Sequence, residues 1–225
     1  MTSNARKAFA GLFRSLLIVA AIFFIPAWSL RFWEGWVYLA IMGAASLAII
    51  LYLATYDDAL IGRRLKAGPV AEKEKSQKII QTFTAAAGVI LFLVPGFDFR
   101  WQWSNVPTTL IVLGDVGVVA GYVIIFLVFR ENTYASSIIE VAESQKVIST
   151  GPYAVVRHPM YAGAILIFFA TPLALDSWWA FIPAIIVSAI VAVRLVDEEK
   201  FLAARLTGYE DYRRQVRYRL IPGIW

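Results

Sequence analysis

Long apolar stretches separated by short polar segments run through the whole chain. An α-helix needs roughly 20 predominantly apolar residues to cross the hydrocarbon core of a bilayer. The stretches that approach this length extend over Phe9 to Leu30, Trp33 to Tyr56, Ile79 to Phe97, Pro107 to Phe129, Met160 to Leu175 and Trp178 to Val196. The pattern predicts an all-α fold, a polytopic membrane protein with about six transmembrane helices. The fifth stretch is short and contains Thr171 and Pro172, which favours a kink or partial insertion.

The positive charges orient these stretches, because lysine and arginine accumulate in short cytoplasmic connections. All but two of the 21 lysine and arginine residues lie at the N-terminus, in the second and fourth connections or in the C-terminal segment, and the exceptions are Arg31 and Arg100. Tryptophans gather beside the other connections, as at a membrane–water interface. We therefore expect both termini and a helical C-terminal segment on the cytoplasmic side, with the first stretch retained as an anchor.

Composition agrees with a membrane protein, since 60% of the residues are hydrophobic and only 16% are charged. Residues 1–225 are expected to form a single integral membrane domain, with four spans in residues 1–129. Cysteine is absent, which excludes disulfides, a cysteine nucleophile and cysteine-based metal sites. A single histidine also argues against a structural zinc site, so no metal is expected.

The net charge of +5 does not indicate nucleic-acid binding, because the basic residues lie between apolar stretches and form no stripe with interleaved aromatics. Anionic lipid headgroups are the expected partner. The most conspicuous charged run, GRRLKAGPVAEKEKSQK, is expected to be a solvated loop with an interfacial helix. Contact with a headgroup or a partner is the alternative for this run.

Two polar segments on the cytoplasmic side are not explained by topology. One begins at Arg130 and continues through TGPYAVVRHPMYAG, which contains the only histidine, His158. The other is RLVDEEKFLAARLTGYEDYRRQV. The last two apolar stretches are joined by a turn around Asp176 that is too short for anything but antiparallel neighbours. His158 and Tyr161 should therefore lie near Glu198 and Glu199.

Pro159 suits the first turn of a helix, so a helix is expected to begin near His158 and to offer unpaired N–H groups to a carboxylate or phosphate. Gly163 would let a ligand or a neighbouring helix approach closely. Each feature also has a simpler explanation. Arg157 would only contact headgroups, His158 would only cap the helix, and Glu198 would only pair with Arg194 along the helix. Two adjacent carboxylates at a membrane edge are costly, which favours a polar ligand.

The segment RHPMYAG, followed after a hairpin by EEKFLAARLTGYEDYRRQVRYRLIP, resembles the isoprenylcysteine carboxyl methyltransferase and phospholipid methyltransferase superfamily of integral membrane enzymes. The resemblance extends from Arg130 to Pro222 and also includes the bacterial-looking segment ENTYASSIIEVAESQKVISTGPY. The positions that match the superfamily pattern are Arg157, His158, Pro159, Tyr161, Gly163, Glu198, Glu199, Leu202, Gly208, Tyr212 and Pro222.

The resemblance implies methyl transfer from S-adenosylmethionine, held at the cytoplasmic face by residues 130–225 with the helical hairpin 160–196. An activated sulfonium donor requires neither a covalent nucleophile nor a metal, so alignment and exclusion of water are the main tasks. The expected cofactor-binding residues are Arg157, His158, Tyr161, Gly163, Glu198, Glu199 and Tyr212. The expected catalytic residues, which close the pocket or face the acceptor, are Arg130, Asn132 and Glu199.

The expected acceptor is lipophilic, either an isoprenoid or prenylcysteine-like carboxylate or a lipid amine. An amine must lose a proton, for which Glu131, Glu199 or water would serve as base. One alternative is a sterol-reductase-type enzyme that binds NADPH, although its related motif has glutamate where this chain has Ala164. Another is a membrane accessory protein without activity. The expected location is the bacterial inner membrane, and the oligomeric state stays open.

Overall fold

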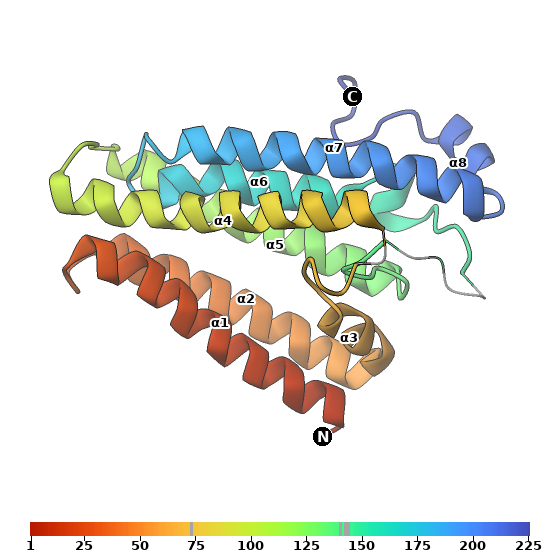
Figure 1. Cartoon of the computed structure of the whole chain (residues 1–225), viewed down its shortest axis with the longest axis horizontal. Helices are drawn as coiled ribbons and strands as arrows, with labels where there is room; N and C mark the ends of the chain where they lie inside the picture. Colours follow the sequence, from red (N-terminus) through yellow and green to blue (C-terminus); the bar gives the residue numbers. More distant parts are fainter. Residues whose placement is uncertain (73, 140, 142–144) are drawn as a thin grey trace.

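The computed structural model describes the chain except for residues 73, 140 and 142–144. The described residues form α-helices and a 3₁₀ turn with no strand, so the predicted all-α class is confirmed (Figure 1). The elements are α1 (Ser3–Ala27), α2 (Trp33–Tyr56), α3 (Asp58–Leu65), α4 (Lys75–Trp101), α5 (Thr108–Glu131), η1 (Gly151–Ala154), α6 (Pro159–Ala174), α7 (Phe181–Arg205) and α8 (Tyr209–Gln215).

Helices are present at every apolar stretch that the sequence indicated. Four of them, α1, α2, α4 and α5, are long and apolar enough to cross a membrane. Helix α6 has 16 residues and contains Pro172, and the last turns of α7 are charged. Crossing of the membrane by α6 and α7 therefore stays a prediction.

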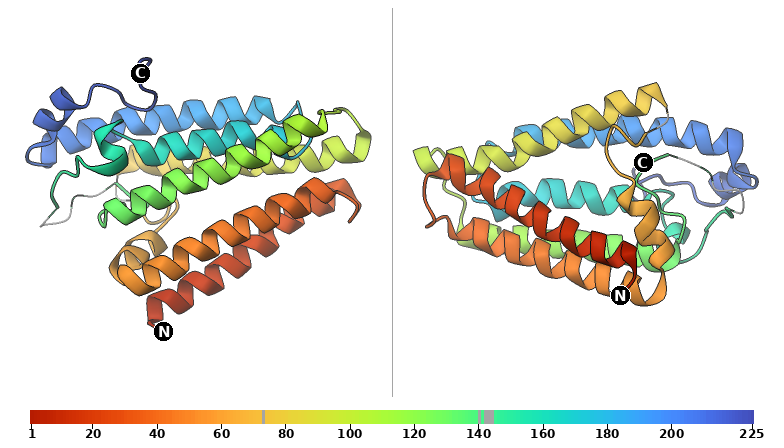
Figure 2. Two further views of the ribbon diagram at one scale, coloured as in Figure 1. Left: turned by 180° about the vertical axis from the view of Figure 1, so that it is seen from behind. Right: turned by 60° about the horizontal axis from the view of Figure 1, so that its bottom comes forward.

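The long helices α4 to α7 lie side by side, and the α1–α2 pair packs obliquely along one side of them (Figures 1 and 2). Helix α5 lies against α6, α4 lies against α7, and α1 contacts both α2 and α4. The short connections between α1 and α2, α4 and α5, and α6 and α7 gather at one end of the molecule (Figure 1). Helix α3, helix α8 and the long connection before α6 gather at the other end, where the candidate site is found.

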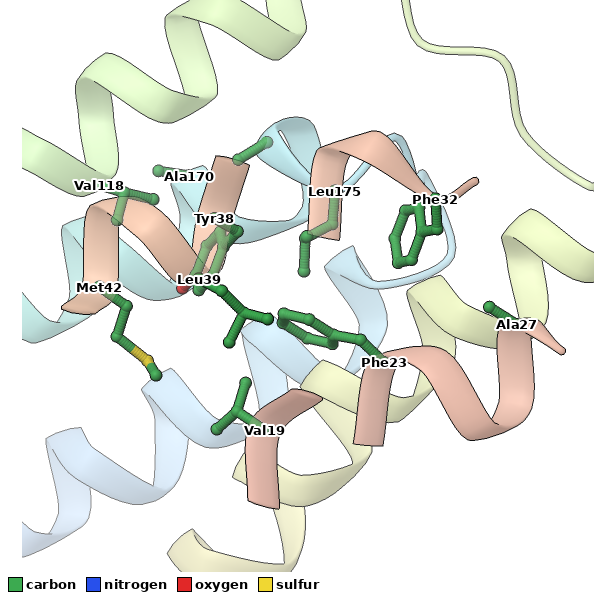
Figure 3. Packing of buried hydrophobic residues seen from close by; sticks show 11 residues of the cluster. Val19, Phe23, Ala27, Phe32, Tyr38, Leu39, Met42, Val118, Ala170 and Leu175 are labelled. Atoms are coloured by element: carbon green, nitrogen blue, oxygen red, sulfur yellow. The ribbon is translucent and has the colours of Figure 1, made fainter. Parts of the chain in front are cut away.

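A hydrophobic core with aromatic rings from α1 and α2 joins this helix pair to α5 and α6 (Figure 3). Phe23 lies at its centre, and its ring makes edge contacts with Phe32, Tyr38 and Phe92. The buried Tyr38 hydroxyl lies 2.7 Å from the Thr171 hydroxyl, which satisfies both groups. This packing fixes α6 against the N-terminal helices.

Helices α5 and α6 cross at unusually short range because glycines line the contact. A Cβ on Gly114 would lie 2.4 Å from the backbone nitrogen of Ala174, and one on Gly121 would lie 2.7 Å from the backbone oxygen of Gly163. Small residues allow this close approach of backbones, as in many membrane helix pairs. The crossing fixes the start of α6 relative to the end of α5, on either side of the candidate site.

The expected hairpin is present, since α6 ends at Ala174 and α7 begins at Phe181. The Ser177 hydroxyl donates to Asp98 at 2.6 Å, and Asp98 also accepts from the backbone N–H of Ser104 at 2.7 Å. These bonds tie the α6–α7 connection to the end of α4 and the connection that follows it.

The charged run between α2 and α4 differs from the solvated loop that the sequence indicated. The run begins within helix α3, and an interfacial position of that helix stays a prediction. Arg63 and Arg64 bind Thr133 and Ser136 in the long connection before α6. Glu72 is only 3% exposed and pairs with Arg194. Contacts inside the chain therefore replace solvent at Arg63, Arg64 and Glu72, whereas Lys66, Glu74, Lys75 and Lys78 are exposed as the sequence indicated.

Candidate functional site

A cavity of about 440 Å³ opens at the end of the helices where α3, α8 and the long connection meet. Its wall combines the end of α3, the start of α4 and α6, the second half of α7, the connection after α5 and helix α8. Sites for cofactor-sized ligands fall in the range of roughly 300–1,000 Å³. The cavity therefore has the size for such a ligand, with polar and apolar walls.

Most of the residues predicted from the sequence converge on this cavity. Those that line it are Asn132, Arg157, His158, Tyr161, Glu198 and Tyr212. They come from segments up to 80 positions apart in the chain, and the α6–α7 hairpin brings the two motifs together as expected. The functional roles assigned to them stay predictions.

Glu199 lies behind the cavity wall and is 4% exposed. Its Oε1 accepts from Arg157 Nε at 2.6 Å and lies 3.3 Å from His158 Nε2, while its Oε2 accepts from Arg219 Nε at 2.8 Å. Burial acts to raise the pKa of Glu199, but the hydrogen bonds from His158, Arg219 and Arg157 hold that pKa well below the ordinary value. Glu199 is therefore charged at neutral pH and binds the residues that form this wall of the cavity.

The same cluster binds the C-terminal segment to the start of α6. Arg157 Nη1 donates to the backbone oxygens of Val216 and Arg217 at 3.0 and 2.8 Å. The backbone N–H groups of Arg157 and His158 donate to Tyr218 and Arg219. Arg157 is 7% exposed, so the alternative that it only contacts headgroups does not hold. His158 precedes the first residue of α6, but its ring binds Glu199 instead of capping the helix.

Gly163 and Arg130 lie outside the cavity wall. A Cβ on Gly163 would lie 2.9 Å from the backbone oxygen of Gly121, so the close neighbour of Gly163 is helix α5. Arg130 is exposed at the end of α5. The proposed roles of these two residues toward a ligand stay predictions, and the geometry gives Gly163 a packing role.

Asn132 and Tyr212 hold one wall of the cavity together through Tyr153. Asn132 Nδ2 donates to the Tyr153 hydroxyl at 2.8 Å, and the Tyr212 hydroxyl donates to the backbone oxygen of Tyr153 at 2.8 Å. Burial raises the pKa of Tyr153 to about 12, so its hydroxyl stays protonated at neutral pH. This wall offers neutral aromatic surface to a ligand.

Several cavity residues carried no clear signal in the sequence. The sequence predicts only a helix pairing with Glu198 for Arg194 and no site role for Tyr209, yet both are buried and line the cavity. Arg64 lines it from α3, and burial lowers the pKa of Arg64 to about 10. An arginine inside a largely apolar stretch is a signal that could have identified Arg194.

Two buried polar atoms of the cavity wall have no hydrogen-bond partner among the described residues, Arg194 Nη1 and the Tyr209 hydroxyl oxygen. Arg194 is 7% exposed and Tyr209 is 4% exposed. Burying such a group without a partner costs about 1–3 kcal/mol. Both atoms are therefore candidates for contacts with a polar ligand.

A Tyr209→Phe variant tests this idea at the hydroxyl. It is expected to keep or slightly raise the thermal unfolding midpoint in detergent, because the lost hydroxyl has no partner among the described residues, and to lower ligand affinity severalfold. Tyr212→Phe is the matched control, since it removes a real bond to Tyr153 and should cost about 0.5–1.5 kcal/mol of stability. Equal losses of stability in both variants would contradict the assignment.

Comparison with known proteins agrees with the family resemblance that the two sequence motifs indicated. Residues 109–207 match the family model of phospholipid methyltransferases. The chain is also 33% identical over 145 residues to methanethiol S-methyltransferase from Crocosphaera subtropica (strain ATCC 51142 / BH68). That alignment covers 64% of this chain and 51% of the relative, so the chain spans about half of the relative's length. The family match begins at the start of α5, whereas the resemblance seen in the sequence begins only at Arg130. The family match ends before α8.

Proposed function

We propose, from the chain's membership of the integral membrane methyltransferase superfamily, that it transfers a methyl group from S-adenosylmethionine to a lipophilic acceptor. The observation that carries the proposal is the cavity at which Arg157, His158, Tyr161 and Glu198 converge. Both superfamily motifs contribute to one wall of it. A general methyl-transfer activity follows from the superfamily, while the cofactor and the acceptor are the parts proposed here.

The residues of the cavity suit S-adenosylmethionine. The unpartnered Arg194 Nη1 can donate to a carboxylate, and Glu198 can accept from an ammonium or hydroxyl group. Tyr153, Tyr209 and Tyr212 offer aromatic surface to a purine. These residues would hold the cofactor, whose sulfonium supplies an already activated methyl group.

The chain's own residues then bind and orient both reactants and exclude water. Glu199 supports this geometry because its charge fixes Arg157 and His158 in the wall. Its low pKa and its three donors make Glu199 unsuited to accept a proton, and Glu131, which accepts from the Thr150 hydroxyl, does not line the cavity. Among the described residues that line the cavity, Glu198 is the only carboxylate, and it is already assigned to the cofactor. Water is therefore the base that we assign if the acceptor must lose a proton.

The acceptor is expected to be apolar apart from its reacting group. Ile125, Met160, Ala164 and Val191 form the part of the cavity wall that faces the helix bundle. The proposed acceptors are an isoprenoid or lipid with a carboxylate or amine. A small apolar thiol is the second candidate, because the relative is named for methanethiol.

We also propose that the cavity faces the cytoplasm of a bacterial inner membrane. The support is the distribution of positive charge, which gathers in the connections and the C-terminal segment around the cavity. A polar cofactor from the cytosol and a lipophilic acceptor from the bilayer would meet at this interface. The proposed arrangement has six spans with both termini on the cytoplasmic side.

Binding and transfer experiments on the detergent-purified chain test the function. S-adenosylhomocysteine is expected to bind in isothermal titration, and NADPH is expected not to bind. The chain is then incubated with methyl-labelled S-adenosylmethionine and either total bacterial lipid or methanethiol. Label in a lipid supports the first acceptor class, and labelled dimethyl sulfide supports the second.

Two binding results would overturn the proposal. Binding of NADPH would favour the reductase alternative, and binding of neither cofactor would favour an accessory protein.

A further inference from the structure

The segment after α8 folds into a closed turn over residues 221–225. The backbone N–H of Ile224 donates to the backbone oxygen of Ile221 at 3.1 Å, and Gly223 between them has a φ of 81°. Pro222 followed by a residue of positive φ is typical of a type II turn. Backbone bonds in both directions between Ile221 and Trp225, at 3.2 and 3.1 Å, close the turn at its base. The turn therefore has a fixed shape.

This turn exposes large apolar side chains outside the membrane-spanning candidates. Ile221 is 50% exposed, Ile224 is 77% exposed and Trp225 is 37% exposed. Lipid accounts for exposed apolar side chains on the long helices, but the turn follows α8 and belongs to no candidate span. A group of such side chains marks an interaction surface, and tryptophan in it is typical of a membrane–water interface.

Arginines precede the turn along the chain. Residues 212–225 contain four arginines and no acidic residue. Arg213 and Arg214 pair with acidic residues of α8, and Arg219 pairs with Glu199. Arg217 is exposed and has no ion pair among the described residues. The segment thus combines exposed apolar side chains with a cation that is available to an anionic partner.

The position of the turn favours the membrane surface as that partner. After α8 the chain turns back along α7, and its marked end lies alongside that helix, not beyond α8 (Figures 1 and 2). The segment is therefore directed toward the long apolar helices that a bilayer surrounds. The boundary between headgroups and acyl chains accepts apolar side chains and offers phosphates to neighbouring basic residues.

The same segment is also bound to the wall of the cavity. The backbone N–H of His158 donates to the backbone oxygen of Arg219 at 3.0 Å. Arg219 Nε donates to Glu199 at 2.8 Å, and the Arg219 guanidinium lies 5.4 Å from the centroid of the Trp225 ring. Arg219 therefore contacts both the turn and the buried cluster that supports the cavity wall.

We infer that the 221–225 turn and Arg217 dock onto an anionic membrane surface, and that this docking stabilises the cavity wall. The isoleucines and Trp225 enter the headgroup region, and Arg217 contacts lipid phosphates. A docked turn favours the position of Arg219 in the wall, so a ligand bound in the cavity and the lipid surface favour each other by the same factor. The lipid contact does not depend on the proposed function, whereas the effect on cofactor binding rests on it.

A single fluorescent label tests the docking. The chain has no cysteine, so Ile224→Cys creates a unique attachment site. The labelled full chain is placed in nanodiscs of phosphatidylcholine, either alone or with an equal share of phosphatidylglycerol. Nitroxide on the lipid headgroups is expected to quench the label strongly in the anionic discs and weakly in the neutral ones. Thr207→Cys, exposed between α7 and α8, is the control position and should show little quenching in either disc.

Arg217→Gln in the labelled chain tests the role of charge. One basic residue near an anionic surface favours binding by about fivefold, so the ratio of docked to undocked turn should fall about fivefold. The backbone oxygen of Arg217 still accepts from Arg157 in this variant, which preserves that bond to the wall. Lys7→Gln, at an exposed position near the start of α1, is the matched control and should behave like the labelled parent. Thermal unfolding checks that each variant is folded.

Titration of the unlabelled chain with S-adenosylhomocysteine tests the link to the cavity. Binding is expected to be severalfold tighter in the anionic discs than in the neutral ones, and Arg217→Gln should reduce that difference. Equal affinity in both discs would overturn the link between docking and the wall.

The quenching result decides the docking separately from the proposed function. Equal quenching at position 224 in both discs would overturn the anionic contact. No quenching in either disc would show that the turn does not meet the membrane, which overturns the inference. If the chain binds no S-adenosylhomocysteine in either disc, the proposed function fails, while the quenching of the label still tests the lipid contact.

Discussion

Replacing Glu199 by alanine is expected to lower the free energy of unfolding by about 3–5 kcal/mol, because the substitution leaves the buried guanidinium of Arg157 without its counter-ion. Arg157 and His158 are both at least nine-tenths buried, and Arg219 is partly buried. Cofactor affinity should fall in the same variant, since Arg157 and His158 form part of the cavity wall. The measurements are thermal unfolding in detergent and titration with S-adenosylhomocysteine.

Glu210→Ala is the matched control for charge removal at the same end of the molecule. Its ion pair with Arg213 is exposed and lies within α8, and such pairs contribute about 0–1 kcal/mol. A Glu199→Ala variant as stable as Glu210→Ala would show that the buried cluster does not hold the site together. A stable variant that lost only cofactor affinity would instead support the direct ligand contact predicted from the motif.

The second large effect is expected for Gly163→Ala. The new Cβ would lie 2.9 Å from the backbone oxygen of Gly121 and 3.1 Å from Ile125 Cγ1, so helix α6 must move away from α5. Overpacking of this kind typically costs about 1–3 kcal/mol. Because α6 begins at the cavity, weaker cofactor binding should accompany the loss, and both are measured as for Glu199.

Gly88→Ala provides the control for adding a methyl group to a glycine of a long helix. No atom lies within 4 Å of the Cβ position at Gly88, and alanine favours the helix. This variant should be as stable as the parent or slightly more stable. A Gly163→Ala protein that unfolds at the same temperature as Gly88→Ala would contradict the close α5–α6 crossing.

The helices and their order could be predicted from the sequence because hydrophobic length is a strong signal. The predicted second span, Trp33 to Tyr56, has the bounds of α2, and the hairpin turn at Asp176 was placed correctly. The contacts of the charged run after α2 were predicted less accurately. The sequence shows that Glu72 and Arg64 are charged, but not that Arg194 would pair with Glu72 or that Arg64 would line a cavity.

The sequence predicted which site residues lie near one another, but not which contacts they make. Hairpin geometry brought His158 and Glu198 together, since both lie near the same ends of antiparallel helices. It could not separate Glu198, in the cavity wall, from Glu199, beneath it, because adjacent helical residues differ only in the face they present. The contact of Arg219 with Glu199 depends on how the C-terminal segment folds back, for which the sequence contains no periodic signal.

The Glu72–Arg194 pair has a consequence for how such a sequence can change over time. Glu72 lies outside the residues that match the family model, whereas Arg194 lies inside them. Loss of either charge leaves the other buried and unpaired, which is strongly unfavourable. Substitutions at the two positions should therefore be accepted together, so that the connection before α4 and the residues that match the family model are inherited as a matched pair.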